Sequence, residues 1–189
     1  MVSIEEVCAR SEIHQVLMRY VRGVDRRDPD LLESAYFADA VDVRSYSPAE
    51  TPPGALAARV IDGFGETPEF SQHHMTNVIY DIDCAAGVAD VESYVLVFHP
   101  VGPETSQTLR PADGQSHVRF AGARYLDRFE RRDDEWRIAR RVCVVDWSRT
   151  DLFGDADPVL SQHLGGLAPG VRDADPSEWA SEWSTRRSR

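Results

Sequence analysis

One aspartate of the chain lies where the sequence pattern otherwise places apolar side chains. Apolar residues recur at spacings of three and four near the N-terminus, and Asp25 follows Val21 by four residues, so it falls on the same helical stripe. It also comes close to the expected end of that helix, where the helix dipole disfavours negative charge. A carboxylate there needs a partner, which is either Arg22 or Arg26 in a surface ion pair, or a group in a functional site.

Two adjacent histidines, His73 and His74, occur in an extended segment rich in β-branched residues. Neighbouring residues of a strand point to opposite faces, so only one of the two can face the interior. We expect this to be His73, with His74 as the alternative. A histidine beside a carboxylate can act as a base near neutral pH, because the carboxylate fixes its tautomer and stabilises the imidazolium. An ordinary half-buried histidine is the competing interpretation.

Arg141 is a third candidate for the site. Strand alternation places it with Ala139, Cys143 and Val145 on a face of small, apolar residues. A guanidinium buried on that face would pair with Asp25 or stabilise an anion that develops on a substrate. The alternative is one more surface arginine.

Two tyrosines, Tyr20 and Tyr125, fall on buried positions of the same pattern. Either they are core residues, or their hydroxyls bind a substrate inside an apolar pocket.

The residue inventory excludes several kinds of chemistry. All 21 basic residues are arginine, which rules out Schiff-base and P-loop lysines. Hydrolase, metalloprotease and dinucleotide-binding motifs are missing, and the six histidines have no metal-ligand spacing. We therefore expect neither a cofactor nor a metal.

The N-terminal part of the chain is predicted to be helical and the rest extended. A capping box at Ser3 and Glu6 opens a helix over residues 4–25, and Asp28-Pro29 opens a shorter one. The shorter helix should bury Leu31, Leu32, Ala35 and Tyr36. The further expectations are a strand at 41–46, a loop at 47–54, a helix at 55–64, strands at 72–82, 88–99, 118–131 and 136–147, and a loop at 100–117.

Helices followed by consecutive antiparallel strands indicate an α+β fold. A curved sheet wrapped around N-terminal helices leaves a cavity where the helices do not fill it, and such cavities bind ligands. We assign residues 1–150 to this domain and 151–189 to a tail that packs on the domain or on a neighbouring subunit.

The composition of the chain excludes some classes of binding partner. A chain of 189 residues suits one domain, and a formal net charge of −11 argues against nucleic acid and against an acidic membrane surface. A small, mostly apolar substrate remains. The first residues carry acids where a secretory signal needs basic ones, and the three cysteines show no CxxC spacing. We therefore expect a cytoplasmic protein.

Several phrases resemble the SnoaL-like branch of the NTF2-like superfamily: YVRGVDRRD, HHMTN, VADVESYVLVFH and GARYLDRFERRDDEWRIARRVCVVDW. The resemblance covers roughly residues 5–150 and implies a cone-shaped α+β barrel. Its dehydratase and dehydrochlorinase members, which include scytalone dehydratase, bile-acid 7α-dehydratase and hexachlorocyclohexane dehydrochlorinase, pair an aspartate at the end of the first helix with a histidine on the strand that opens the sheet. The matching positions are Asp25 and His73, and Arg141 and Tyr20 match two further family positions.

The resemblance implies a lyase-type elimination on a small cyclic or polyketide-like molecule. His73 would remove a proton, Asp25 would orient it, and Arg141 with Tyr20 or Tyr125 would steady the oxyanion or the leaving group. Isomerisation, polyketide cyclisation and a non-catalytic role, such as an oxygenase β subunit, remain alternatives on this fold. The resemblance and the tail tryptophans predict a homo-oligomer, a trimer before a dimer.

Overall fold

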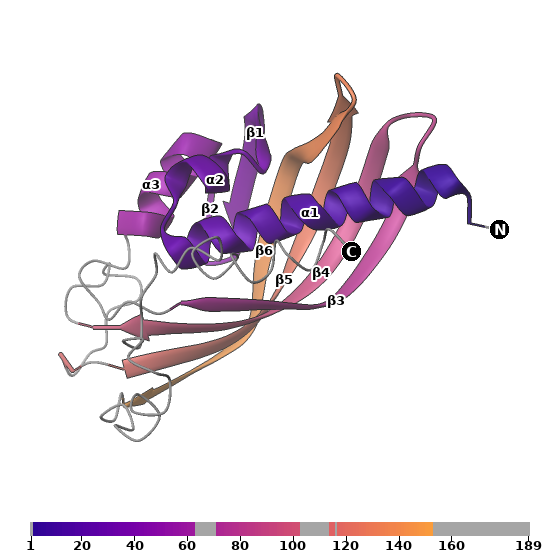
Figure 1. The fold of residues 1–189 in the computed structure, drawn as a ribbon. Helices are drawn as coiled ribbons and strands as arrows, with labels where there is room; N and C mark the ends of the chain where they lie inside the picture. The colour runs from indigo at the N-terminus through magenta and orange to yellow at the C-terminus, as the bar shows by residue number, and fades with distance from the viewer. Residues whose placement is uncertain (1, 63–70, 103–113, 116, 153–189) are drawn as a thin grey trace, which may run out of the picture.

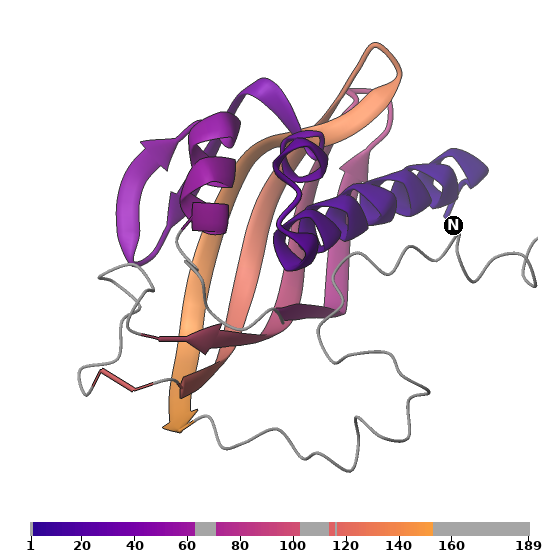
Figure 2. The same ribbon diagram turned by 60° about the vertical axis from the view of Figure 1, so that its left-hand side comes forward.

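The computed structural model of the chain describes residues 2–62, 71–102, 114–115 and 117–152. These residues form three helices and one six-stranded sheet in the order β2-β1-β6-β5-β4-β3. The sheet curves around the helices, which lie on one side of it (Figure 1; Figure 2). The predicted α+β class is confirmed, with a cone-like sheet that does not close into a full barrel.

The first helix, α1 (Ile4–Arg26), follows the predicted stripe. Its cap residue Ser3 accepts a hydrogen bond from the Glu6 backbone N–H at 3.1 Å. The helix ends at Arg27, which takes a left-handed conformation with φ 53°. Asp25 therefore lies in the last turn, as predicted. The buried residues of α1 are Ala9, Ile13, Val16, Leu17, Tyr20, Val21, Gly23 and Val24.

The second helix, α2 (Pro29–Glu33), packs directly on α1. Asp28 caps it by accepting the Leu31 backbone N–H at 2.9 Å. The two helices meet at Gly23, where an added Cβ would lie 2.6 Å from the Leu32 nitrogen. Only glycine permits this approach, which fixes the end of α1 and with it the position of Asp25.

The predicted extent of the second helix was wrong. Ala35 and Tyr36 are buried, but they do not belong to α2, because β1 (Tyr36–Arg44) begins at Tyr36. The Ala35 carbonyl accepts a hydrogen bond from the Ile138 N–H at 3.0 Å, and Tyr36 pairs with Ile138 in the sheet. Pairing with a distant strand overrides the local helical pattern here.

The segment predicted as a loop at 47–54 contains a short strand, β2 (Ser47–Thr51), before α3 (Pro53–Asp62) begins. Its prolines suggest a loop because proline cannot donate to a sheet. However, β2 lies at the edge and pairs only with β1, and an edge strand tolerates a missing donor.

The four long strands confirm the predicted extended segments: β3 (Gln72–Asp83), β4 (Val88–Val101), β5 (His117–Arg132) and β6 (Glu135–Leu152). Each pairs with the next in antiparallel fashion, and β6 then lies parallel to β1. Asp133 and Asp134 connect β5 to β6 with φ values of 50° and 63°, the backbone of a tight two-residue hairpin.

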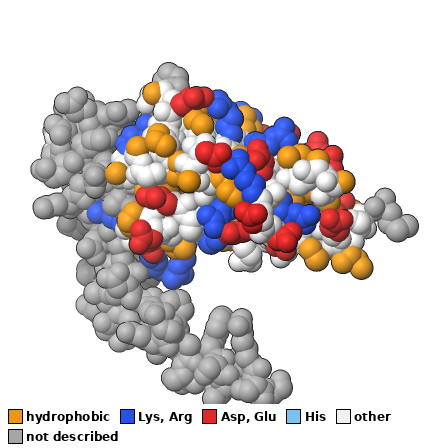
Figure 3. Space-filling view, turned by 90° about the horizontal axis from the view of Figure 1, so that it is seen from above, with side chains coloured by type: hydrophobic (Ala, Val, Ile, Leu, Met, Phe, Trp, Pro, Cys, Tyr) orange, Lys and Arg blue, Asp and Glu red, His pale blue; other side chains and the backbone are white. Residues whose placement is uncertain are grey.

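The surface carries both signs of charge, and on the face in Figure 3 acidic and basic side chains are interspersed. Within the described ranges no helix has the length and apolarity required to cross a membrane. Strand β6 extends to Leu152, so the rest of the tail assigned to 151–189, and residues 103–113 of the expected long loop, lie outside the described residues.

Candidate active site

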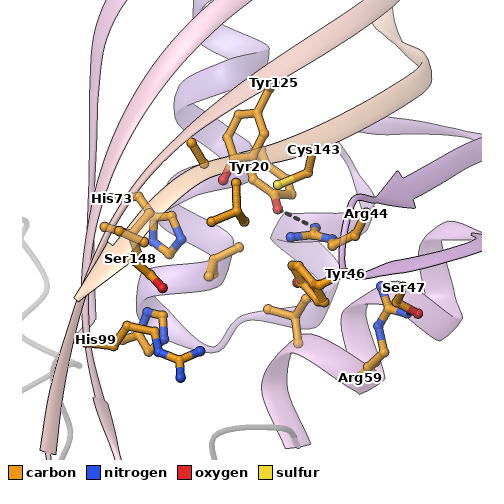
Figure 4. A pocket seen from close by; sticks show the side chains of 17 residues that line it. Tyr20, Arg44, Tyr46, Ser47, Arg59, His73, His99, Tyr125, Cys143 and Ser148 are labelled. Atoms are coloured by element: carbon orange, nitrogen blue, oxygen red, sulfur yellow. Dashed lines mark hydrogen bonds between the residues drawn. The ribbon is translucent and has the colours of Figure 1, made fainter. Parts of the chain in front are cut away.

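A cavity of about 330 Å³ lies between the concave face of the sheet and the helices (Figure 4). Its apolar walls are formed by Val24, Val60, Val97, Ala121, Ala123 and Val145. Its polar and polarisable lining consists of Tyr20, Arg44, Tyr46, Ser47, Arg59, His73, His99, Arg119, Tyr125, Cys143 and Ser148.

The Asp25 carboxylate holds His73 through two hydrogen bonds. Its Oδ1 lies 2.6 Å from the imidazole Nδ1, and its Oδ2 accepts the His73 backbone N–H at 3.0 Å. The two side chains are sheltered, with exposed fractions of 21% for Asp25 and 9% for His73. The two residues that the family resemblance pairs are therefore in direct hydrogen-bond contact.

This arrangement determines which imidazole nitrogen faces a ligand. An ionised carboxylate can only accept, so Nδ1 donates the hydrogen bond to Asp25 and Nε2 is left as the acceptor. His73 lines the cavity, whereas Asp25 lies behind it. The prediction that His73 rather than His74 faces the interior is confirmed. His74 is exposed, lies 3.2 Å from the Gln72 side chain and packs against Phe98.

Tyr20 and Tyr125 both line the cavity, and their rings pack edge to face with centroids 5.6 Å apart. The Tyr20 hydroxyl accepts a hydrogen bond from Arg44 at 2.9 Å, and Arg44 is itself paired with Asp42, Nε to Oδ1, at 2.9 Å. Burial raises the pKa of Tyr125 well above its usual range, so this hydroxyl stays protonated and able to donate. Both tyrosines are thus placed to donate to an oxygen of a ligand.

Arg141 is fully buried but does not line the cavity. Of the two roles predicted for it when buried, pairing with Asp25 or stabilising a substrate anion, the pairing with Asp25 was wrong. Its guanidinium makes two hydrogen bonds to Asp127, at 2.7 and 2.6 Å. Asp127 lies directly opposite Arg141 on β5, whereas Asp25 belongs to α1. The guanidinium carbon also lies 4.1 Å from the centroid of each of the Tyr20 and Tyr125 rings, so it packs against both tyrosines without lining the cavity.

His99 and Arg119 occupy directly opposite positions on β4 and β5 and both line the cavity. Burial, together with the nearby His73 and Arg119, lowers the pKa of His99 to about 3, so His99 is neutral at physiological pH. Burial also lowers the pKa of Arg119. The Arg119 Nε is buried, and in the described part of the chain nothing accepts a hydrogen bond from it.

The described residues contain no group of three or more histidine, cysteine, aspartate or glutamate side chains placed to hold a metal ion. The chemistry available within these ranges is that of an imidazole base, tyrosine hydroxyls and guanidinium groups.

The family model described as a SnoaL-like domain matches residues 5–142, most of the chain. The chain belongs to the SnoaL-like family. Among solved structures, a type 2 hexachlorocyclohexane dehydrochlorinase superposes on this SnoaL-like chain with a TM-score of 0.66 at 17% identity, covering 82% of this chain and 97% of that one. A candidate scytalone dehydratase from Novosphingobium aromaticivorans has a TM-score of 0.59 at 19% identity, covering 81% and 98%. At these identities the two structures show a shared fold.

Sequence relatives of the SnoaL-like chain include an uncharacterised protein of Mycobacterium tuberculosis and its counterpart in Mycobacterium bovis. Each is 29% identical over 143 residues, which is 75% of this chain and 88% of the relative.

Sequence reasoning missed the polar residues that complete this SnoaL-like cavity: Arg44, Tyr46, Arg59, His99 and Arg119. A signal was present for Arg44, because strand alternation from the buried Ala40 places it on the inner face of β1. The positions of His99 and Arg119 follow only from the β4–β5 register, which the long connection between these strands does not determine.

Proposed function

We propose that this SnoaL-like protein is a lyase-type enzyme that eliminates a leaving group from a small, mostly apolar, cyclic or polyketide-like substrate, and that it needs no cofactor. The observation that carries the proposal is the Asp25–His73 pair, joined at 2.6 Å, with the imidazole on the cavity wall. A carboxylate that holds one imidazole nitrogen leaves the other as a base.

In the first step, Nε2 of His73 takes a proton from the carbon next to a carbonyl, and the electron pair forms an enolate. Asp25 stabilises the imidazolium that results. In the second step, the enolate reforms the carbonyl, a carbon–carbon double bond forms, and the bond to the leaving oxygen breaks. The departing hydroxide takes the proton from His73 and leaves as water, which restores the neutral imidazole.

The enolate oxygen needs donors, and the two tyrosines are placed to supply them. The Tyr20 hydroxyl accepts a hydrogen bond from Arg44, which makes its own O–H a stronger donor. Figure 4 places His73 and Arg44 on opposite sides of the cavity, so a ring between them could present one edge to the base and its carbonyl to Tyr20. Arg141 acts here as a positioning residue, because it touches both tyrosine rings but does not line the cavity.

The neighbouring folds support an elimination over other uses of this cavity, since they include a dehydrochlorinase and a candidate dehydratase. A non-catalytic carrier would need no imidazole held by a carboxylate. An isomerase would share the first step but not the second.

The test is the dehydration of 3-hydroxy-1-tetralone, which loses water and tautomerises to 1-naphthol, a product followed by its fluorescence. We expect turnover by the wild type, and His73→Ala should lower the rate by ~10²–10⁴-fold, the usual contribution of a general base. His74→Ala is the matched control, because His74 is the adjacent residue on the opposite face, and it should keep the wild-type rate.

Equal rates for the wild type and His73→Ala, whether both high or both at background, would contradict the proposal. An isomerase in place of a lyase would exchange the proton beside the carbonyl without forming naphthol.

A further inference from the structure

We propose that the substrate carries a carboxylate and that Arg119, which lies two strands from the base on the sheet wall of the cavity, binds it. This inference deepens the proposed function, since it names the substrate class of the same site. It concerns binding alone, so it can be tested without turnover.

The cavity lining is unusual in its charge. Among the described residues it contains three arginines, Arg44, Arg59 and Arg119, and no aspartate or glutamate. The chain as a whole has a formal net charge of −11, and both signs mix on the face in Figure 3. An acidic protein that gathers only guanidinium groups around a cavity favours an anion inside it.

The three arginines are not equivalent. Arg44 is neutralised by Asp42 and is further occupied by Tyr20. Arg59 is exposed and donates to the Ser47 hydroxyl at 3.5 Å. These two have partners in the protein.

Arg119 differs because none of the described carboxylates lies within ion-pair distance of it. Its guanidinium is half-buried, and its Nε is fully buried without a hydrogen-bond acceptor in the described ranges. A half-buried cation without a carboxylate partner is unfavourable, and a carboxylate bound at its terminal nitrogens supplies the missing partner. A guanidinium also matches a carboxylate with two parallel hydrogen bonds.

The register of the sheet sets the distance between this cation and the base. His73 pairs with Val97, Val97 pairs with Ala121, and Arg119 lies two residues from Ala121 on β5. The backbones of His73 and Arg119 are therefore separated by two strand spacings of about 4.8 Å and two residues of about 3.4 Å each along the strand. Side chains that converge from these positions leave room for a one- or two-ring body between them.

The walls between the two groups fit that body. Val97 and Ala121 face the cavity between His73 and Arg119, and they offer apolar contact only. One guanidinium beyond an apolar wall suits a monoanion on an otherwise apolar ring, and a polyanion such as a phosphate ester would need more donors.

The experiment is calorimetric titration of the full chain with 2-naphthoate and with 2-naphthamide, which has nearly the same shape but no charge. We expect the wild type to bind the naphthoate at least ~10-fold more tightly, as one charge-assisted pair supplies. Arg119→Met should lower naphthoate affinity to that of the amide while leaving amide binding unchanged, which also shows that the variant is folded. Arg128→Met is the control, because Arg128 lies on the same strand but pairs with Asp90 away from the cavity.

Equal affinity for the two ligands, no binding of naphthoate, or an undiminished preference in Arg119→Met would overturn the proposal. His73→Ala should retain the preference for naphthoate. Preference for naphthoate without dehydration of 3-hydroxy-1-tetralone would support the anion site and contradict the proposed reaction. Dehydration without a preference for naphthoate would support the reaction and contradict the anion site.

Discussion

Asp25 and His73 are 48 positions apart in the sequence, yet they act on each other as one unit. The carboxylate binds both the backbone N–H and the ring Nδ1 of the same histidine. These two contacts fix the position of the strand end relative to α1 and fix the tautomer of the ring at the same time. The base is thus positioned by the hydrogen bonds that activate it.

The buried His99 should make the stability of the protein depend on pH. Its pKa is lowered to about 3 in the folded protein, against 6.5 for the usual value, so the unfolded chain binds a proton that the folded chain does not. The folding free energy contributed by neutral His99 is complete above pH 6.5 and is lost as the pH falls towards 3. Between pH 7 and pH 5 the wild type should lose about 2 kcal/mol more than His99→Gln.

Urea unfolding of both proteins at the two pH values measures this difference. Parallel losses in the wild type and His99→Gln would show that His99 becomes protonated in the folded state as readily as in the unfolded chain.

Part of the site was predictable, because Asp25 is a charged residue at a position that the pattern reserves for apolar groups, and the family resemblance pairs it with His73. The partner of Arg141 was not predictable in this way. Which carboxylate meets it depends on the β5–β6 register, and Asp127 was hidden within a run of alternating charges, LDRFERRDDE. Local sequence indicates that a buried arginine needs a partner but does not identify the partner.

Among the elements of the fold, strands β5 and β6 supply the ion pair that packs against the two cavity tyrosines. Asp127 on β5 and Arg141 on β6 form an ion pair with both side chains fully buried, and the guanidinium contacts both the Tyr20 and the Tyr125 ring. The aromatic rings that line this part of the cavity therefore pack against a buried ion pair. Its stability depends on both members, because a lone buried charge has no compensation.

Asp127→Ala should accordingly lower the free energy of unfolding by about 3–5 kcal/mol, since it leaves Arg141 buried and unpaired. The double variant Asp127→Leu with Arg141→Met should be less destabilised than Asp127→Ala, because it removes both charges. Chemical denaturation of the two variants gives the comparison. A double variant at least as unstable as Asp127→Ala would show that packing, and not the unpaired charge, dominates.

The boundaries of short elements could not be predicted from local sequence. Helix α1 and the four long strands follow from periodicity and caps, because each is long and strongly patterned. Tyr36 does not, because it pairs with Ile138 far along the chain. Strand β2 does not, because it forms only through its pairing with the neighbouring β1. Short segments follow the sheet that they join rather than their own propensity.

On the whole molecule, the outer face of the sheet carries several large apolar side chains that are exposed. Ile79, Tyr94, Leu96 and Leu126 are exposed there, with exposed fractions between 38% and 58%. They come from three adjacent strands, β3, β4 and β5. Apolar side chains gathered in this way are typical of an interface.

We expect a homo-oligomer built on this outer face, with a trimer as the first expectation. Analytical ultracentrifugation should give about three times the 21.2 kDa mass of one chain, and Ile79→Glu with Leu126→Glu should give a monomer because charges would be buried at the contact. Val7→Glu, which alters an exposed apolar residue of α1, should leave the mass unchanged. A wild-type monomer at micromolar concentration would contradict the expectation.

If Asp25 and His73 form one base with the imidazole on the cavity wall, the pair should remove a proton from a carbon next to a carbonyl. The measurement is the exchange of the protons beside the carbonyl of 1-tetralone in D₂O, followed by NMR for the wild type, His73→Ala, Asp25→Asn and the double variant. We predict exchange in the wild type that each single variant reduces by ~10²-fold or more, with the double variant no slower than the slower single one, because groups that act as a unit are not additive. Exchange that survives in His73→Ala, or losses in the two single variants that multiply in the double variant, would contradict the account.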